Sequence, residues 1–474
     1  MKRTGRKRNW GARVGLGACL LGSLSSLGCG DAQQTLYLPF DTQPSCSEPP
    51  FACFNANAAT LDAGGVKLIY KRIAGHPTVA LSVLIDRDPV DAPPRSALQY
   101  WSETFALNMM FRSGRYQDGS SRWPALWDRL GASFSGSGSS EDYTALSVEV
   151  PLPNWQEAWQ LLAGAIEQPY ANDYELDFEK SRIGRAYQVE LDDPESAADI
   201  IAWSRLFEHN ARNLGRETQA QMTQASVATV RAAWNLLRAR PRLLAVVVGD
   251  VAAEDAVAAV SESVSGWASV SSNATFPADP TPSLPHDSDV SILKYPDSPT
   301  WHISSYFAGP RADSPDYAPL ALGLRVLDQR LFAQVRDERG LAYTLSSGLV
   351  FARQTYGGLS LSTEKPLDAL PLVAQIIREL KTSGPRPDEL DTEREQLRTS
   401  FLSSATTPMG QAGLLASWEL SAGDRQGLDA LLAELDSITP AEVSTALASY
   451  LTAAKSAAAG PGDSVTADSL RALF

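Results

Sequence analysis

Two stretches in the first half of the chain alternate apolar and polar side chains with a period of two residues. They read PTVALSVLI at 77–85 and TALSVEV at 144–150. Because successive side chains of a strand point to opposite faces of a sheet, this alternation predicts two strands. We expect each strand to have one buried face and one solvated face.

A helical period of three to four residues follows in PNWQEAWQLLAGAIEQP, at 153–169. Asn154 is positioned as the N-cap of this helix. One face of the helix would carry four large apolar side chains, those of Trp155, Trp159, Leu162 and Ile166. The predicted order around these segments is strand, helix, helix, strand, strand, helix, helix. This order is not the regular alternation of a doubly wound sheet, so the expected fold class is α+β.

The chain also repeats itself. ELDFEKSRIGRAYQVELDDP (175–194) and ELDTEREQLRTSFLSSATTP (389–408) share Glu, Leu, Asp, Glu and the closing Pro, position for position and without a gap. At nearly the same spacing, YTALSV (143–148) parallels YGGLSL (356–361), and HPTVALSV (76–83) parallels SPTWHISS (298–305). Three blocks in the same order indicate the duplication of a domain of about 200 residues.

A stretch rich in Pro, Ser and Asp divides the two copies. It reads SSNATFPADPTPSLPHDSD, and we interpret residues 271–289 as a linker between domains. The first domain would then cover 59–270 and the second 290–474. Residues 29–58 are polar and contain Pro without a periodic pattern, which is typical of a leader or tether.

The N-terminus has the pattern of a bacterial secretory signal at residues 1–28. It contains six Lys or Arg residues and no acidic one before a short apolar run from Val14 to Leu27. The run is too short and too rich in Gly and Ser for a transmembrane helix. We favour Cys29 as a lipid attachment site, although Ser26 stands where Leu is usual. Ordinary signal cleavage is the alternative; LGAC, ending at Cys19, matches the lipidation pattern better but leaves almost no apolar run before it.

Two further cysteines lie in the leader, in CSEPPFAC. In an exported chain the compartment is oxidising, so we expect a disulfide between Cys46 and Cys53. A metal site made of these two thiols is disfavoured because no His lies near them in the sequence.

The charge of the chain excludes some classes of partner. Without residues 1–28, 35 basic residues would face 55 acidic ones, a net charge of about −20. Such a charge argues against binding to nucleic acid or to an anionic membrane surface. A lipid anchor would be the chain's contact with a membrane.

The segment LGLRVLDQRLFAQVRDERGLAYTLSSGLVF (322–351) predicts a helix ended by Gly340 and a strand from Leu341. Arg336 would lie in the last helical turn, and Tyr343 seven residues on, in the strand. With this Arg, this spacing and a Gly-Leu-Ala-Tyr turn, the chain resembles the M16 metallopeptidase family, which includes pitrilysin, insulysin, mitochondrial processing peptidase and bacterial periplasmic enzymes. The resemblance covers nearly all of the chain after the signal, including its duplication.

The resemblance implies two homologous M16-type (LuxS/MPP-like) domains, each an antiparallel-rich sheet backed by helices, in a clamshell arrangement hinged by the linker. In that family the first domain binds zinc with His-x-x-Glu-His on a helix and with a Glu some seventy-odd residues later. Tyr100 and Thr104 stand here at the two His positions and Glu103 at the general base. The distal ligand would fall near Ala186–Gln188, where no carboxylate occurs, although Glu190 is close.

Neutral phenol and aliphatic hydroxyl groups are poor zinc ligands. The four His of the chain are dispersed along the sequence, at His76, His209, His286 and His302. We therefore expect neither a cofactor nor a catalytic residue in this chain, and zinc in a partner chain. Glu103 would be a residual or solvated helix carboxylate.

Arg336 and Tyr343 match the residues with which the family's second domain binds the substrate backbone and the developing oxyanion. A guanidinium and a phenol can both donate hydrogen bonds to carbonyl oxygens. The alternative readings are an Arg that complements a helix C-terminus and a Tyr in the core. FSGSGSSE (134–141) is either a flexible loop or the neighbour of an edge strand to which an extended peptide adds.

These observations predict a non-catalytic, substrate-binding subunit of a bacterial periplasmic M16-type zinc peptidase. The partners would be a zinc-bearing M16 homologue, in a heterodimer, and a peptide. The chain would be exported to the periplasm or anchored in the outer membrane of a Gram-negative bacterium. A catalytically dead envelope lipoprotein that acts as a scaffold is the alternative, and a peptidase with a rebuilt metal site is the third.

Overall fold

The computed structural model describes residues 54–55, 57–86, 96–113, 122–139, 142–167, 170–207, 219–238, 243–264 and 287–474. The expected signal peptide, Cys29, Cys46, Cys53 and residues 271–286 of the expected linker lie outside the described residues. None of the described helices is long and apolar enough to cross a membrane.

The elements before residue 265 are β1 (Ala58–Ala63), β2 (Val66–Arg72), β3 (Thr78–Asp86), α1 (Ala97–Ser113), α2 (Trp123–Leu130), β4 (Ser133–Ser139), β5 (Tyr143–Pro151), α3 (Trp155–Glu167), α4 (Asp173–Asp192), α5 (Pro194–Leu206), α6 (Gln219–Met222), α7 (Val227–Arg238), β6 (Leu243–Gly249) and α8 (Ala253–Ser263). The elements after residue 288 are β7 (Asp289–Lys294), β8 (Trp301–Ala308), α9 (Tyr317–Leu331), the π-helical turn η4 (Phe332–Asp337), β9 (Thr344–Val350), β10 (Tyr356–Thr363), α10 (Pro366–Ser383), α11 (Pro387–Ser404), α12 (Pro408–Ser417), α13 (Gly427–Glu434), α14 (Pro440–Tyr450), β11 (Lys455–Gly460) and α15 (Ala467–Arg471).

The strands form two sheets with the same topology. The first is six-stranded, in the order β1-β2-β6-β3-β5-β4, and the second is five-stranded, in the order β7-β11-β8-β10-β9. Apart from β1, each strand of the first sheet has a counterpart at the same place in the second. The pairs β2–β6 and β7–β11 are parallel and the other pairs are antiparallel. The predicted α+β class, with antiparallel-rich sheets backed by helices, is confirmed.

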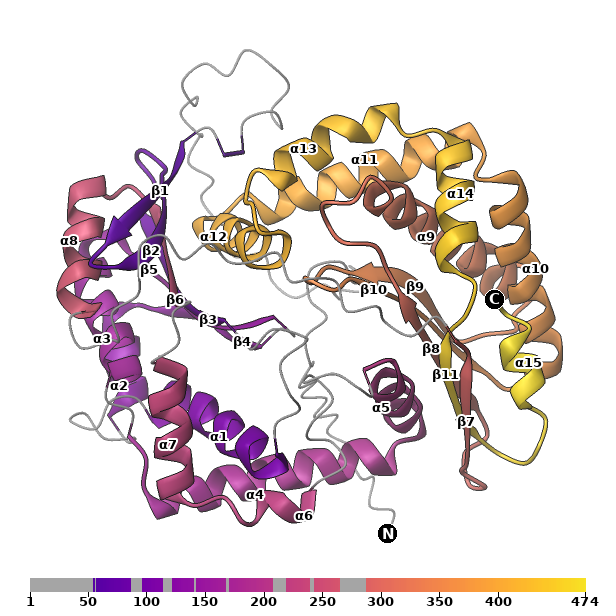
Figure 1. Cartoon of the computed structure of the whole chain (residues 1–474), viewed down its shortest axis with the longest axis horizontal. Coiled ribbons are helices and arrows are strands. Elements are labelled where there is room, and N and C mark those ends of the chain that lie inside the picture. Colours follow the sequence, from indigo (N-terminus) through magenta and orange to yellow (C-terminus); the bar gives the residue numbers. More distant parts are fainter. Residues whose placement is uncertain are drawn as a thin grey trace, which may run out of the picture.

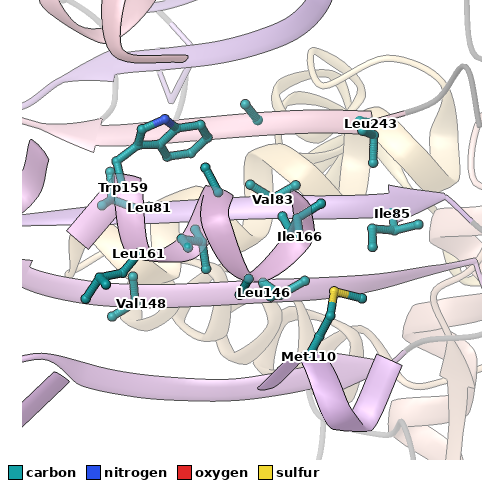
Figure 2. Close-up of a cluster of buried hydrophobic side chains, with 14 of the residues drawn as sticks. Leu81, Val83, Ile85, Met110, Leu146, Val148, Trp159, Leu161, Ile166 and Leu243 are labelled. Atoms are coloured by element: carbon teal, nitrogen blue, oxygen red, sulfur yellow. The ribbon is translucent and has the colours of Figure 1, made fainter. Parts of the chain in front are cut away.

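One face of the first sheet forms the core of the first half. Figure 2 shows part of it, with Trp159, Leu161 and Ile166 of α3 beside Leu81, Val83, Leu146 and Val148 of the sheet. The apolar face predicted for 153–169 is therefore buried. The helix begins at Trp155, after the 3₁₀ turn η1 (Leu152–Asn154), and the Asn154 side-chain amide donates to the Leu130 carbonyl oxygen at 3.0 Å.

The two predicted strands differ in burial. β5 alternates between buried and half-buried positions, as its sequence predicts. β3 is buried on both faces, so the prediction of a solvated face is wrong there. The physical reason is α12, whose Ala412, Leu415 and Ala416 pack on the face of the first sheet opposite α3. β3 is therefore covered on both faces, and most of its side chains are apolar.

The two halves exchange one helix each, as Figure 1 shows. α12 belongs to the second half of the sequence but lies on the first sheet. Reciprocally, Ala198 and Ala202 of α5 pack against Ala457 and Ala459 of β11 in the second sheet. These two helices begin at the two prolines that close the repeated blocks, so the exchange follows the internal symmetry of the chain.

A buried polar cluster joins the halves beside α12. The Arg353 Nε donates to the Leu420 carbonyl oxygen at 2.8 Å, and its Nη2 donates to the Asp86 carboxylate. The Arg353 backbone N–H donates to Asp142 Oδ2 at 2.7 Å, which also accepts from Ser421 Oγ at 2.8 Å. Asp86 and Asp142 are each 1% exposed and Arg353 is 6% exposed. The buried guanidinium is thus held by an ion pair with Asp86 and by a hydrogen bond to a backbone carbonyl oxygen.

The end of the expected leader is also packed against both halves. The Phe54 carbonyl oxygen accepts from Lys71 Nζ of β2 at 2.5 Å, and the same Nζ lies 4.3 Å from the centroid of the Phe54 ring. The Asn55 Nδ2 donates to Asp429 Oδ2 at 2.9 Å and to the Arg425 carbonyl oxygen at 3.0 Å. These contacts hold residues 54 and 55 against both halves.

Burial of Lys71 makes stability depend on pH in the alkaline range. Burial lowers the pKa of Lys71 from 10.5 to about 8, and Asp429 opposes this effect. Between these two values the unfolded chain binds more protons at Lys71 than the folded chain, so the free energy of unfolding should rise with pH. Relative to Lys71→Met, the wild type should gain about 2–3 kcal/mol between pH 8 and 10.5 in urea titrations. A difference that does not change with pH would contradict this.

Candidate functional site

Helix α1 carries the three positions that align with a zinc motif. Glu103 is 8% exposed, and Tyr100 packs at the border of the first core with its ring edge-on to Trp101, at 5.3 Å between centroids. The neighbouring Ser102 Oγ donates to Thr229 Oγ1 of α7 at 2.9 Å. The Thr104 carbonyl oxygen accepts from the Asn108 side chain at 2.8 Å. These side chains serve the packing of α1.

The donor set on α1 does not fit zinc. Two neutral hydroxyl groups, from Tyr100 and Thr104, flank one carboxylate, whereas protein zinc sites use imidazole, thiolate or carboxylate ligands. In the part of the chain that the structure describes, no three His, Cys, Asp or Glu side chains gather where they could hold a metal ion. We therefore derive no chemical step through zinc at this helix.

The structure reveals a buried acid of α4 that the sequence argument missed. Glu179 is 1% exposed and accepts from Arg182 Nη2 at 2.7 Å, and Arg182 also donates to Asn108 of α1 at 3.2 Å. Gln188, in the segment where the distal ligand was expected, is instead exposed and donates to Asp192. The sequence holds a signal for Glu179, because this residue lies three positions after the buried Leu176, on the inner stripe of the helix.

The internal repeat explains this buried acid. Glu179 of α4 aligns with Glu393 of α11 in the two repeated blocks, and Glu393 is 2% exposed. Arg325 of α9 donates to Glu393 at 2.9 Å. Burial raises the pKa of Glu393, and Arg325 opposes this effect. A buried acid paired with an Arg thus occurs in both halves, which indicates a structural role in the repeated fold.

Arg336 and Tyr343 lie on a tightly bonded turn after α9, which we call the corner (residues 332–344 and 362–367). Gly340 has a φ of 58°, its N–H donates to the Arg336 carbonyl oxygen, and the Leu341 N–H donates to that of Val335, each at 2.9 Å. With the left-handed Gly340 at C′, the Gly340–Arg336 bond is the αL motif, which ends the helix where the sequence predicts. The strand β9 begins at Thr344 and not at Leu341, because this turn occupies the residues between.

The corner is also bonded to the end of β10. The Tyr343 N–H donates to the Ser362 carbonyl oxygen at 2.9 Å, and Thr363 Oγ1 donates to the Leu341 carbonyl oxygen at 2.5 Å. The Lys365 N–H donates to the same Thr363 Oγ1 at 2.9 Å. Residues 336, 343 and 364 therefore stand on one backbone unit with little freedom to move apart.

The side chains of the corner face solvent. The Arg336 guanidinium lies over the Phe332 ring, 4.5 Å from its centroid, and Arg336 is exposed. A guanidinium stacked on a ring can still donate hydrogen bonds in its own plane. Tyr343 is 60% exposed, so the reading of this Tyr as a core aromatic is wrong. Glu364, as the acceptor of a side-chain hydrogen bond, raises the pKa of Tyr343.

The strands β4 and β9 stand at equivalent ends of the two sheets. β4, which contains the Ser/Gly stretch at 133–139, is the last strand of the first sheet, so this stretch is a strand and not a loop. Its counterpart β9 is the last strand of the second sheet. There the Ser347 N–H donates to Asp328 Oδ1 and the Ser347 Oγ donates to the Leu324 carbonyl oxygen, each at 2.8 Å. Helix α9 thereby occupies the outer edge of β9.

Comparisons with known proteins agree with this fold. Residues 225–397 match the family model described as the peptidase M16 inactive domain. No curated protein sequence matches the chain. A crystal structure of a peptidase M16 inactive domain from Pseudomonas fluorescens is 20% identical, with a TM-score of 0.74, and the match covers 86% of this chain and 100% of that one.

Two other solved structures have the same fold. The periplasmic protease PqqL from Escherichia coli is 18% identical, with a TM-score of 0.68, and the match covers 86% of this chain and 46% of PqqL. Complex III2 from Candida albicans contains a chain that is 13% identical, with a TM-score of 0.68, and the match covers 88% of this chain and 99% of that one. Residues 225–397 of this chain therefore form an M16 peptidase domain of the inactive type.

Proposed function

We propose that this chain is the non-catalytic, substrate-binding subunit of an exported M16-type zinc peptidase, and that it works as a heterodimer with a zinc-bearing homologue. The observation that carries the proposal is the contrast between its two candidate sites. The helix α1 lacks the donors for zinc, whereas the corner presents Arg336 and Tyr343 to solvent on a rigid backbone. The chain would bind peptide, and the partner would supply zinc and the general base.

The corner is chemically suited to an extended peptide. A stacked guanidinium such as that of Arg336 can donate in-plane hydrogen bonds to a carbonyl oxygen at a small loss of conformational entropy. The phenol of Tyr343 adds a polar contact beside it. Neither group would compete for the metal of a partner chain.

The edge of the first sheet is the better place for the rest of the peptide. An extended peptide can add to an exposed strand by backbone hydrogen bonds, and β4 ends its sheet. The equivalent edge of β9 is occupied by Asp328, whose pKa is raised by its burial against this strand. The Ser and Gly residues of β4 favour the close approach of another backbone.

The exchange of α5 and α12 changes how a clamshell would work. Each of these helices is buried on the sheet of the other half, so opening the chain between its halves would expose both apolar interfaces. We therefore assign the clamshell movement to the contact between this chain and its partner. The domains at 59–270 and 290–474 would move as one body.

Helix α4 presents an apolar surface that suits a protein partner. Tyr174, Phe178 and Val189 are 76%, 48% and 69% exposed. The residues at the same repeat positions on α11 are Asp388, Thr392 and Ser403, which shows that the fold does not need apolar groups there. Exposed aromatic side chains in a row are typical of protein interfaces. Assembly of an M16-type fold with other chains has a precedent in complex III2.

Replacing Tyr174 with Asp and Phe178 with Thr, the residues found on α11, should weaken assembly with the zinc-bearing homologue about tenfold or more. The free energy of unfolding should change by less than about 0.5 kcal/mol, because both side chains are exposed. Analytical ultracentrifugation of the mixed chains measures the first quantity. Asp388→Asn with Thr392→Ser on α11 is the matched control, and an equal loss in the control would argue against α4 as the interface.

Arg336→Ala should slow peptide cleavage by the reconstituted pair about a hundredfold, and Tyr343→Phe about tenfold, without preventing assembly. Arg339→Ala removes a neighbouring exposed Arg from the same turn and is the control for charge. Unchanged cleavage by Arg336→Ala and Tyr343→Phe would sink the proposed substrate role. It would leave the scaffold alternative, in which the chain holds its partner without touching the peptide.

The proposal places the chain outside the cytoplasm. Cleavage of residues 1–28, a lipid on Cys29 and a disulfide between Cys46 and Cys53 are parts of it, supported by the sequence pattern alone. Intact-mass measurement of the native protein, before and after reduction, tests all three. A retained N-terminal Met1 would contradict export by this signal.

A further inference from the structure

The corner carries an anionic group beside its two proposed substrate-binding residues. Glu364 is exposed at the end of β10, directly after Thr363, whose hydroxyl holds the Leu341 carbonyl oxygen. The Leu341 N–H donates to the carbonyl oxygen of Val335, the residue before Arg336. Two hydrogen bonds to one residue thus tie the Arg336 turn and the Glu364 turn into one surface.

The phenol of Tyr343 is linked to Glu364. The Tyr343 N–H is bonded to Ser362, two residues before Glu364, and the Glu364 carboxylate is a hydrogen-bond partner of the Tyr343 hydroxyl. A phenol has one proton, so a hydroxyl that donates to Glu364 offers a peptide its lone pairs. At the same time Arg336 can only donate.

This arrangement does not suit a peptide that offers only carbonyl oxygens. Arg336 satisfies a carbonyl, but Glu364 and the Tyr343 oxygen both call for a donor, and the carboxylate calls for a cationic one. Leu367, which is 71% exposed at the start of α10, and Phe332, which is 39% exposed, add apolar surface around these polar groups. The corner therefore combines a carbonyl-binding cation, a cation-binding acid and exposed apolar side chains.

We infer that Glu364 is a third substrate-binding residue, and that it selects peptides with a cationic group next to the carbonyl that Arg336 holds. The cation is either the N-terminal ammonium of the peptide or a Lys or Arg side chain. This inference rests on the proposed substrate-binding function and adds to it the charge class of the substrate. Glu364 also orients the Tyr343 hydroxyl, which makes it a positioning residue for that group.

The test uses decapeptides that the full chain selects from a randomised library, each resynthesised in matched forms. In one pair the N-terminus of the peptide is free or acetylated. In the other pair a Lys is kept or replaced by norleucine. At low ionic strength the wild type should prefer the cationic form of one pair roughly two- to fivefold. Glu364→Gln should abolish this preference. Glu379→Gln removes a carboxylate from an exposed position of α10, and this variant should keep the preference.

The pair that shows the preference identifies the source of the cation. An equal preference in wild type and Glu364→Gln, or an equal loss in Glu379→Gln, would overturn the inference while leaving peptide binding intact. A wild-type chain that selects no peptide would overturn the proposed function and this inference together.

A second readout does not depend on peptides. In ¹³C-tyrosine NMR, with the Tyr343 resonance identified by its loss in Tyr343→Phe, the titration midpoint of this phenol should fall in Glu364→Gln and stay unchanged in Glu379→Gln. A midpoint that does not move in Glu364→Gln would show that the carboxylate does not act on the phenol, and would overturn the positioning role.

Discussion

Replacing Arg353 with Met should lower the free energy of unfolding by about 3–5 kcal/mol. Arg353 is 6% exposed and lies between Asp86 and Asp142, each 1% exposed. Its side chain is held by Asp86 and by the Leu420 carbonyl oxygen, and its backbone by Asp142. Removing the guanidinium would leave the Asp86 carboxylate buried without this cation. The loss would be measured by urea denaturation.

Arg471→Met is the matched control for Arg353→Met. Arg471 is paired with Asp468 on the surface, at side-chain exposures of 52% and 95%, and such pairs contribute about 1 kcal/mol or less. In an Asp86→Asn background Arg353→Met should cost less, because the charge that the guanidinium pairs with is already gone. Equal losses in Arg353→Met and Arg471→Met would show that the cluster between the halves does not hold them together.

Two glycines of α12 should respond to the same substitution with opposite signs. A Cβ on Gly410 would collide with the backbone carbonyl of Ser404, at the end of α11, whereas a Cβ on Gly413 meets nothing within 4 Å. Backbone cannot yield as the end of a side chain can, so Gly410→Ala should shift the start of α12 and destabilise the protein by about 2–3 kcal/mol. Gly413→Ala should stabilise it by about 0.5–1 kcal/mol through helix propensity.

The Gly410 prediction concerns the exchanged helix directly. α12 starts at Pro408 behind the N-cap Thr407, which accepts from the Gly410 N–H at 3.0 Å, and it buries Leu415 on the first sheet. A displaced α12 would lose that contact, so both halves of the chain should be destabilised together. If urea denaturation gives both Ala variants the same sign, the packing of α12 against the end of α11 is not as tight as the structure indicates.

Local patterns predicted the elements of this fold well. The period of β5, the apolar face of α3 and the Gly340 helix end are all set by neighbours in sequence, and each was predicted correctly. The repeat of Pro194 and Pro408 correctly indicated two equivalent halves. The second face of β3 could not be predicted, because it is covered by a helix from the other half of the sequence.

The candidate site, too, could be predicted only where neighbours in the sequence determine it. A helix pattern places Tyr100, Glu103 and Thr104 on α1, and the donor chemistry of these residues argues against zinc. The exposure of Tyr343 depends on the turn before β9 and on β10, which no local pattern encodes. Glu364 has no signal in the sequence, because only the pairing of β9 with β10 brings it to Tyr343. The burial of Glu179 does have a signal in the sequence, since this residue falls on the buried stripe of α4.

We expect this chain to bind substrate without cleaving it. The most direct test is to measure the zinc content and peptide hydrolysis of the purified chain without a partner. We expect much less than one zinc per chain and no hydrolysis that a chelator can abolish. One zinc per chain together with chelator-sensitive hydrolysis, lost in Glu103→Gln, would contradict it.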